Sequence, residues 1–133
     1  MSSSVATSAP ASSGDHPRQA VAYVRGQRLI VDCPAWCTVV HAARDEYFLE
    51  DVSHSSDSLS VSAPVGVSRR EDVLVGHVAE WSFAGESRPR FAFDATGSGE
   101  FSELSKHQAR AELDRIAAHV EHLRRVVDAM PGA

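Results

Sequence analysis

Both cysteines of this 133-residue chain lie in one short run, CPAWCTVVH at residues 33–41, which also holds a histidine. A second histidine, His54, follows thirteen residues after His41. Thiolate and imidazole are the ligands that zinc prefers, and ligands a few residues apart converge readily from a single turn. Residues 33–57 show no clear helical or strand pattern, so something else must hold them in a compact domain. The run therefore predicts a structural Zn2+ site.

The predicted metal ligands are Cys33, Cys37, His41 and His54. A structural zinc site takes four protein ligands, so one of them must come from beyond the first turn and close a loop. His54 is the first choice for this fourth ligand, and the alternatives are Asp45, Asp51 and His77. The competing interpretation is that both cysteines are simply small buried residues and that both histidines lie at the surface.

Composition divides the chain at about residue 20. Residues 1–19 are mostly Ser, Ala, Thr, Pro and Gly, with too few large apolar side chains to offset the entropy of ordering, so we expect a disordered tail. Residues 20–133 are expected to form a single domain, with a zinc-knuckle loop at residues 33–54. The tail lacks the basic start and apolar core of an export signal, and no run is long enough to span a membrane. We therefore expect a cytoplasmic protein with reduced thiols.

Strand patterns occupy much of the predicted domain. Residues 20–32 are rich in β-forming side chains and are interrupted at Gly26, which predicts either a hairpin or one bulged strand. Alternation of apolar and polar side chains, with turn residues between the segments, predicts further strands. These candidates are residues 59–63, 73–83, 88–94 and 100–102. Together they predict an antiparallel β-meander.

Residues 106–129 form the clearest predicted element, an amphipathic helix. Ser105 and Gln108 match the S-x-x-Q capping box that begins a helix. Apolar residues then recur at steps of four and three from Ala109 to Met130 and form one stripe. We expect this stripe to pack on the sheet, which gives a two-layer α+β domain. The same seven-residue repeat also fits a helix that pairs with its twin in a homodimer.

The motif Cys33-Pro34-x-Trp36-Cys37, followed by His41, His54, strands and a C-terminal helix, resembles one known family. This family consists of small actinobacterial proteins that share a domain of unknown function. The resemblance covers most of the chain after residue 20 and depends mainly on the CPAWC run. It implies the same type of domain and brings no activity with it.

A metal site without an accompanying acid–base pair favours a small zinc-stabilised adaptor or regulatory module that binds a protein partner. One alternative is a hydrolase in which an open Cys2His site activates water with Glu46 or Glu50 as base, or in which His41 activates Cys37. A second alternative is a nucleic-acid-binding zinc knuckle, which the net charge of −5 disfavours. The sequence contains no recognisable catalytic signature, so an enzyme is not favoured.

Overall fold

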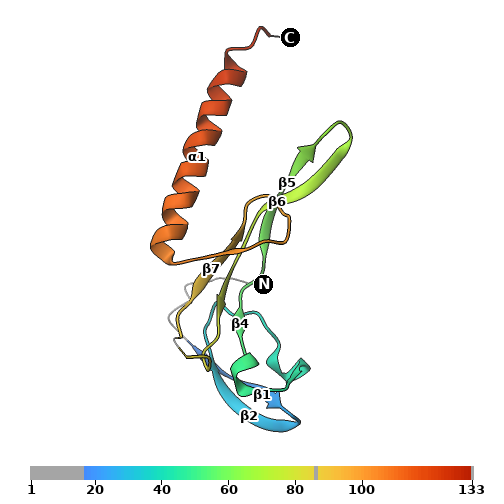
Figure 1. The fold of residues 1–133 in the computed structure, drawn as a ribbon, viewed down its shortest axis with the longest axis vertical. Helices are drawn as coiled ribbons and strands as arrows, with labels where there is room; N and C mark the ends of the chain where they lie inside the picture. Colours follow the sequence, from blue (N-terminus) through green and yellow to red (C-terminus); the bar gives the residue numbers. More distant parts are fainter. Residues whose placement is uncertain (1–16, 86, 133) are drawn as a thin grey trace, which may run out of the picture.

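The computed structural model describes residues 17–85 and 87–132. It contains two β-sheets and one long C-terminal helix, which confirms the expected α+β class. The smaller sheet lies at one end of the molecule, the larger sheet runs through its middle, and the helix begins beside the larger sheet and extends to the opposite end (Figure 1).

The smaller sheet is built on the first hairpin, with strand order β2-β1-β3. Its strands are β1 (Arg18–Val24), β2 (Gln27–Cys33) and β3 (Asp45–Glu46). The chain turns between β1 and β2 at Arg25 and Gly26, which both have positive φ angles, of 49° and 77°. Two such residues in succession form the tight turn that matches the twist of a hairpin. The hairpin interpretation of this segment is therefore confirmed, with β1 beginning at Arg18. The expectation of a disordered tail falls mostly on residues 1–16, which lie outside the described residues.

The larger sheet contains the expected antiparallel meander. Its strands are β4 (His54–Ser55), β5 (Leu59–Val65), β6 (Arg69–Glu80), β7 (Arg90–Asp94) and β8 (Ser102–Leu104). Strand β6 is central, because β7 pairs with one of its edges while β5 and β4 pair with successive parts of the other. Strand β6 corresponds to the expected strand 73–83, but it begins four residues earlier, at Arg69, and ends at Glu80. A turn follows Glu80 where the strand was expected to continue.

The core is small and consists mainly of short side chains. Among the described residues, the buried apolar ones are Ala22, Val31, Cys33, Cys37, Val52, Ala79, Ala92, Phe93 and Ala109. The largest fully buried side chains are those of His54, Val52 and Cys33. The most completely buried part of the domain is therefore not a cluster of large hydrophobic residues, but the place where the predicted ligands lie.

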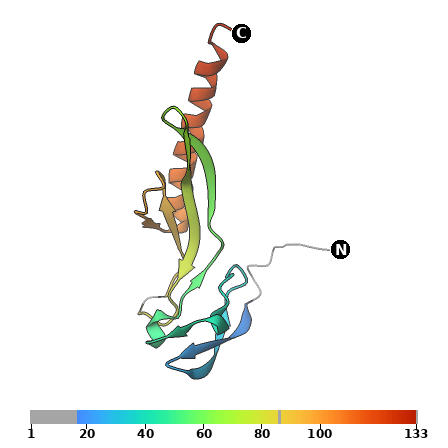
Figure 2. The same cartoon turned by 90° about the vertical axis from the view of Figure 1, so that its right-hand side faces the viewer.

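Helix α1 (Lys106–Asp128) begins with the expected capping box, since Ser105 and Gln108 exchange hydrogen bonds between side chain and backbone. Its packing differs from the expectation that the sheet would cover the whole apolar stripe. Only Ala109 is buried and Ile116 half-buried, because the helix contacts β7 and β8 through its first half. Its last turns extend past the tip of the β5–β6 hairpin (Figure 2). Among the described residues, no helix has the length and apolar character needed to cross a membrane.

Candidate metal centre

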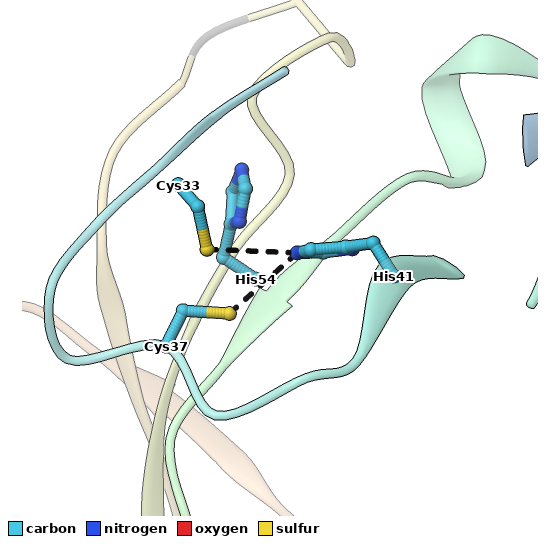
Figure 3. Close-up of side chains that lie close together, drawn as sticks. All are labelled: Cys33, Cys37, His41 and His54. Atoms are coloured by element: carbon cyan, nitrogen blue, oxygen red, sulfur yellow. Dashed lines mark hydrogen bonds between the residues drawn. The ribbon is translucent and has the colours of Figure 1, made fainter. Parts of the chain in front are cut away.

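The four predicted ligands come from four separate segments that meet where the two sheets approach each other. Cys33 ends β2 in the smaller sheet, whereas His54 begins β4 in the larger sheet. Cys37 follows the turn after β2, and His41 begins the 3₁₀ turn η2 (His41–Ala43). Figure 3 shows these four side chains gathered together. The cluster therefore joins two sheets that share no strand pairing.

Backbone contacts shape the loop between the two cysteines. The backbone N–H of Cys37 donates to the carbonyl oxygen of Pro34 at 3.0 Å, which closes a tight turn. The guanidinium group of Arg18, from the neighbouring strand, donates to the carbonyl oxygen of Cys37 at 3.0 Å and to that of Pro34 at 3.5 Å. These bonds fix the turn from outside, so the sulfur atom of Cys37 is held facing that of Cys33.

The distances from the His41 ring to the two sulfur atoms fit tetrahedral coordination. One ligand atom from each of the four residues lies within 4.8 Å of all the others. The Nε2 atom of His41 lies 3.7 Å from the Sγ atom of Cys33 and 3.7 Å from that of Cys37. A tetrahedral zinc ion with ordinary bond lengths separates its sulfur and nitrogen ligands by about 3.6 Å. The distances from His41 to both sulfur atoms therefore match those in a zinc site.

All four side chains are buried, and one of them lacks hydrogen bonds. The exposed fractions are 0% for Cys33, 2% for Cys37, 5% for His41 and 0% for His54. Neither ring nitrogen of His54 has a hydrogen-bond partner. A buried polar atom without a partner costs about 1–3 kcal/mol, so such atoms are rare unless they have a function. A metal bond to one of these nitrogens would remove that cost.

Burial shifts the protonation of the Cys33 thiol. It raises the pKa of Cys33 from 9.0 to about 11, assisted by a hydrogen bond with Cys37 and by the charge of that group, whereas Arg18 lowers it. The neutral thiol is therefore the stable form at pH 7 when no cation is bound. A zinc ion reverses this preference, because its charge stabilises the thiolate.

Burial also lowers the pKa of both cluster histidines below the ordinary value of 6.5. For His41, the positive charges of His54, Arg44 and Arg18 lower the pKa further. For His54, the carboxylate of Glu80 acts in the opposite direction, and Arg18 lowers the pKa. Both imidazoles are therefore neutral at pH 7, which is the form that binds a metal.

The alternative fourth ligands lie elsewhere. The carboxylate of Asp45 accepts a hydrogen bond from the backbone of Gly26 at 2.8 Å, and Asp51 is exposed in the 3₁₀ turn η3 (Leu49–Asp51). The ring of His77 packs edge to face against Phe101, with ring centroids 5.6 Å apart. Within residues 17–85 and 87–132, the Cys2His2 cluster is the only group of three or more potential ligands.

The proposed catalytic bases also lie outside the cluster. Glu46 forms an ion pair of 4.0 Å with Arg44, and Glu50 is exposed in η3. Neither carboxylate belongs to the group of four ligand atoms.

Comparison with known proteins places the whole described domain in one family. Residues 6–132 match the family described as "Domain of unknown function (DUF6907)". The chain belongs to this family. No curated protein and no solved structure matches the chain. Both sheets, the Cys2His2 cluster and helix α1 all lie within the residues matched to DUF6907.

The role of Arg18 is not predicted by the sequence. This residue falls in the expected disordered tail at residues 1–19, but its guanidinium group binds two carbonyl oxygens of the cysteine turn. No local pattern marks it, because its position depends on the pairing of Arg18 with Cys33 across the β1–β2 hairpin.

Proposed function

We propose that Cys33, Cys37, His41 and His54 bind one zinc ion that stabilises the fold. The observation that carries this proposal is the convergence of four buried ligand atoms within 4.8 Å of one another. The donor set supports zinc in particular, because two sulfur and two nitrogen ligands suit this borderline-soft ion in tetrahedral geometry. Calcium and magnesium prefer oxygen ligands, so they fit the cluster poorly.

The zinc ion would act as a cross-link between the two sheets. Two of its ligands sit on strands of different sheets, Cys33 on β2 and His54 on β4. A core of mostly short side chains contributes little hydrophobic stabilisation, and a metal compensates for this in small domains. The free energy of metal binding then becomes folding free energy.

A site with four protein ligands has no open position for a water molecule or a substrate. This favours a structural centre in a protein-binding adaptor or regulatory module over a hydrolase. Reduced cysteines support a location in the cytoplasm. The net charge of −5 supports a protein partner more than a nucleic acid. By its resemblance to an actinobacterial family, we also assign the module to those bacteria.

A second copy of the chain is a further proposed partner. The apolar stripe of α1 continues beyond the sheet, and Val120, Leu123 and Val127 are 44%, 51% and 60% exposed. Two-stranded coiled coils bury stripes with this seven-residue repeat between their helices, which supports a dimer. We therefore include homodimerisation through the C-terminal helix in the proposed function.

Metal analysis of the purified full-length chain tests the zinc proposal. We expect about one zinc ion per chain, and X-ray absorption should show two sulfur ligands at about 2.3 Å and two nitrogen ligands at about 2.0–2.1 Å. A shell with only one nitrogen and an added oxygen would favour the open-site hydrolase. A chain that takes up no metal, even when refolded with zinc, would refute the proposal.

A further inference from the structure

A groove with a volume of about 410 Å³ lies beside the metal centre. Trp36, which is in the turn between the two cysteines, forms one wall, and the first half of α1 forms another through Ala109 and Leu113. Strands β6 and β7 contribute Val78 and Phe91. The lining is therefore mainly apolar, and the groove is large enough for one or two large side chains.

Three cationic side chains surround this apolar surface. Arg90 comes from β7, and Lys106 and Arg110 come from the first turns of α1. No carboxylate is among the described residues that line the groove, and none of the three cations forms an ion pair with any residue that the structure describes. Since the chain as a whole carries a net charge of −5, this is a local positive surface on an acidic protein. Its charge complements an anionic ligand.

The residue types of the groove match those of protein-binding surfaces. Tryptophan and arginine are the residues that most often dominate the energy of protein–protein interfaces, where they surround an apolar centre. Trp36, Arg90 and Arg110 provide these types around one depression. The groove is therefore suited to an apolar anchor side chain with acidic neighbours.

We propose that this groove binds a short segment of a partner protein in which one apolar side chain is flanked by Asp or Glu. The apolar side chain lies against Trp36 and Phe91, and the carboxylates face Lys106 and Arg110. This inference rests on the proposed adaptor function and names the chemistry of the partner. Because Trp36 lies within the Cys33–Cys37 turn, the metal centre also positions one wall of the groove.

The test starts from a random library of 12-residue peptides displayed on phage and selected on the immobilised full-length chain. We expect the enriched peptides to share an apolar residue next to Asp or Glu. The best peptide is then synthesised with a fluorescent label, together with a twin in which every Asp and Glu is replaced by its amide. Anisotropy titrations should show at least tenfold weaker binding for the amide twin, and binding to the original peptide should weaken as salt is added.

Two variants of the chain separate the groove from the general charge of the protein. Arg110→Glu changes the rim of the groove and should weaken peptide binding at least tenfold. Arg125→Glu makes the same change on the same helix, at an exposed position outside the groove, and should leave binding within twofold. Equal affinity of both variants, or enrichment of peptides without acidic residues, would overturn the proposal.

Other occupants give different results. Tighter binding of sodium decanoate than of any selected peptide would assign the groove to a small amphipathic anion. A change from dimer to monomer caused by Arg110→Glu would assign it to a second copy. Metal content, measured on the same samples, separates this inference from the zinc proposal: peptide binding by a chain without zinc refutes only the metal, whereas zinc-loaded chain that binds no acidic peptide refutes only the groove.

Discussion

The imidazole rings of His41 and His54 meet edge to face, with their centroids 5.1 Å apart and their planes at 78°. Both rings are buried, and the pKa of each is lowered below 6.5. A second positive charge at this distance in a buried site would be strongly unfavourable. The pair therefore tolerates metal coordination, which uses the neutral rings, much better than protonation.

This relationship predicts that the metal-free protein becomes less stable as the pH falls below 6.5. The unfolded chain binds protons at its histidines near pH 6.5, whereas the folded chain binds them only at lower pH. The stabilising contribution is thus complete above pH 6.5 and declines as the pH falls toward the lowered pKa values. Urea unfolding of chelator-treated protein between pH 5 and pH 7.5 measures this slope. A His41→Gln variant should have a smaller slope, and a wild-type free energy of unfolding that does not change over this range would contradict the prediction.

Zinc binding at pH 7 should release protons to the buffer. Because the pKa of Cys33 is about 11, its thiol is protonated before the metal binds and must lose its proton to become a ligand. Calorimetric titrations in two buffers with different ionisation enthalpies should give different heats of zinc binding. The difference should correspond to the release of at least one proton per zinc ion. Identical heats in the two buffers would show that the metal does not bind through this thiol.

His54 should contribute more to stability than any exposed histidine. It is 0% exposed, so His54→Ala removes a ligand and also leaves a cavity, at a cost of about 2–4 kcal/mol for the cavity alone. We expect zinc content to fall to a small fraction and the melting temperature to fall by roughly 10 °C or more. His122→Ala, on the exposed surface of α1, serves as the control and should change neither quantity. A His54→Ala protein with full zinc content would show that another residue completes the site.

Local features of the sequence predicted most of the fold and part of the cluster. The bounds of α1 agree with the expectation to within one residue, because capping and helical periodicity depend on neighbours in sequence. Cys37 and His41 likewise follow Cys33 closely enough for one turn to join them. His54 had to be chosen among four residues, because it reaches the cluster only through pairing of β4 with the far end of β6.

Tertiary packing explains what the sequence did not predict. The stripe on α1 has the pattern of a helix that covers a sheet, but pattern alone does not say how far the sheet extends beneath it. The smaller sheet is completed by a parallel pairing of β1 with β3, which joins segments distant in sequence. Leu74 has a positive φ of 52° at the point where the register between β5 and β6 shifts. The sequence does not predict this irregularity, because the residue is not a glycine.

Gly76→Ala should destabilise the larger sheet. A Cβ atom at this position would overlap the ring of Phe91. This ring comes from the adjacent strand β7 and covers the glycine. The ring would have to move, at a cost of about 1–3 kcal/mol. Gly132→Ala is a suitable control, because a Cβ atom there meets nothing within 4 Å. Urea unfolding should show a lower midpoint for Gly76→Ala only, and equal midpoints would mean that Phe91 adapts without cost.

The exposed stripe of α1 predicts a weak, concentration-dependent dimer. In the part of the seven-residue repeat that lies beyond the groove and the sheet, Val120 and Val127 take one core position, and Leu123 and Met130 take the other. Valine at the first position with leucine at the second favours two-stranded coiled coils. Side chains of this size expose on the order of 100 Å² each, so four from each of two helices bury about 800 Å². This area is below the roughly 1,200 Å² of a stable interface, which is why we expect the dimer to be weak.

Sedimentation equilibrium from low to high micromolar concentrations measures this dimer. Leu123→Glu places a charge in the seam, where the leucine is 51% exposed in the single chain, and should abolish dimerisation without unfolding the helix. Ala118→Glu introduces the same side chain on the opposite, solvated face of α1 and should leave the dimer intact. If the wild type and both variants all sediment as monomers, the dimer prediction is wrong. The stripe would then bind a different protein, because an apolar helical face of this length is rarely left in water without a partner.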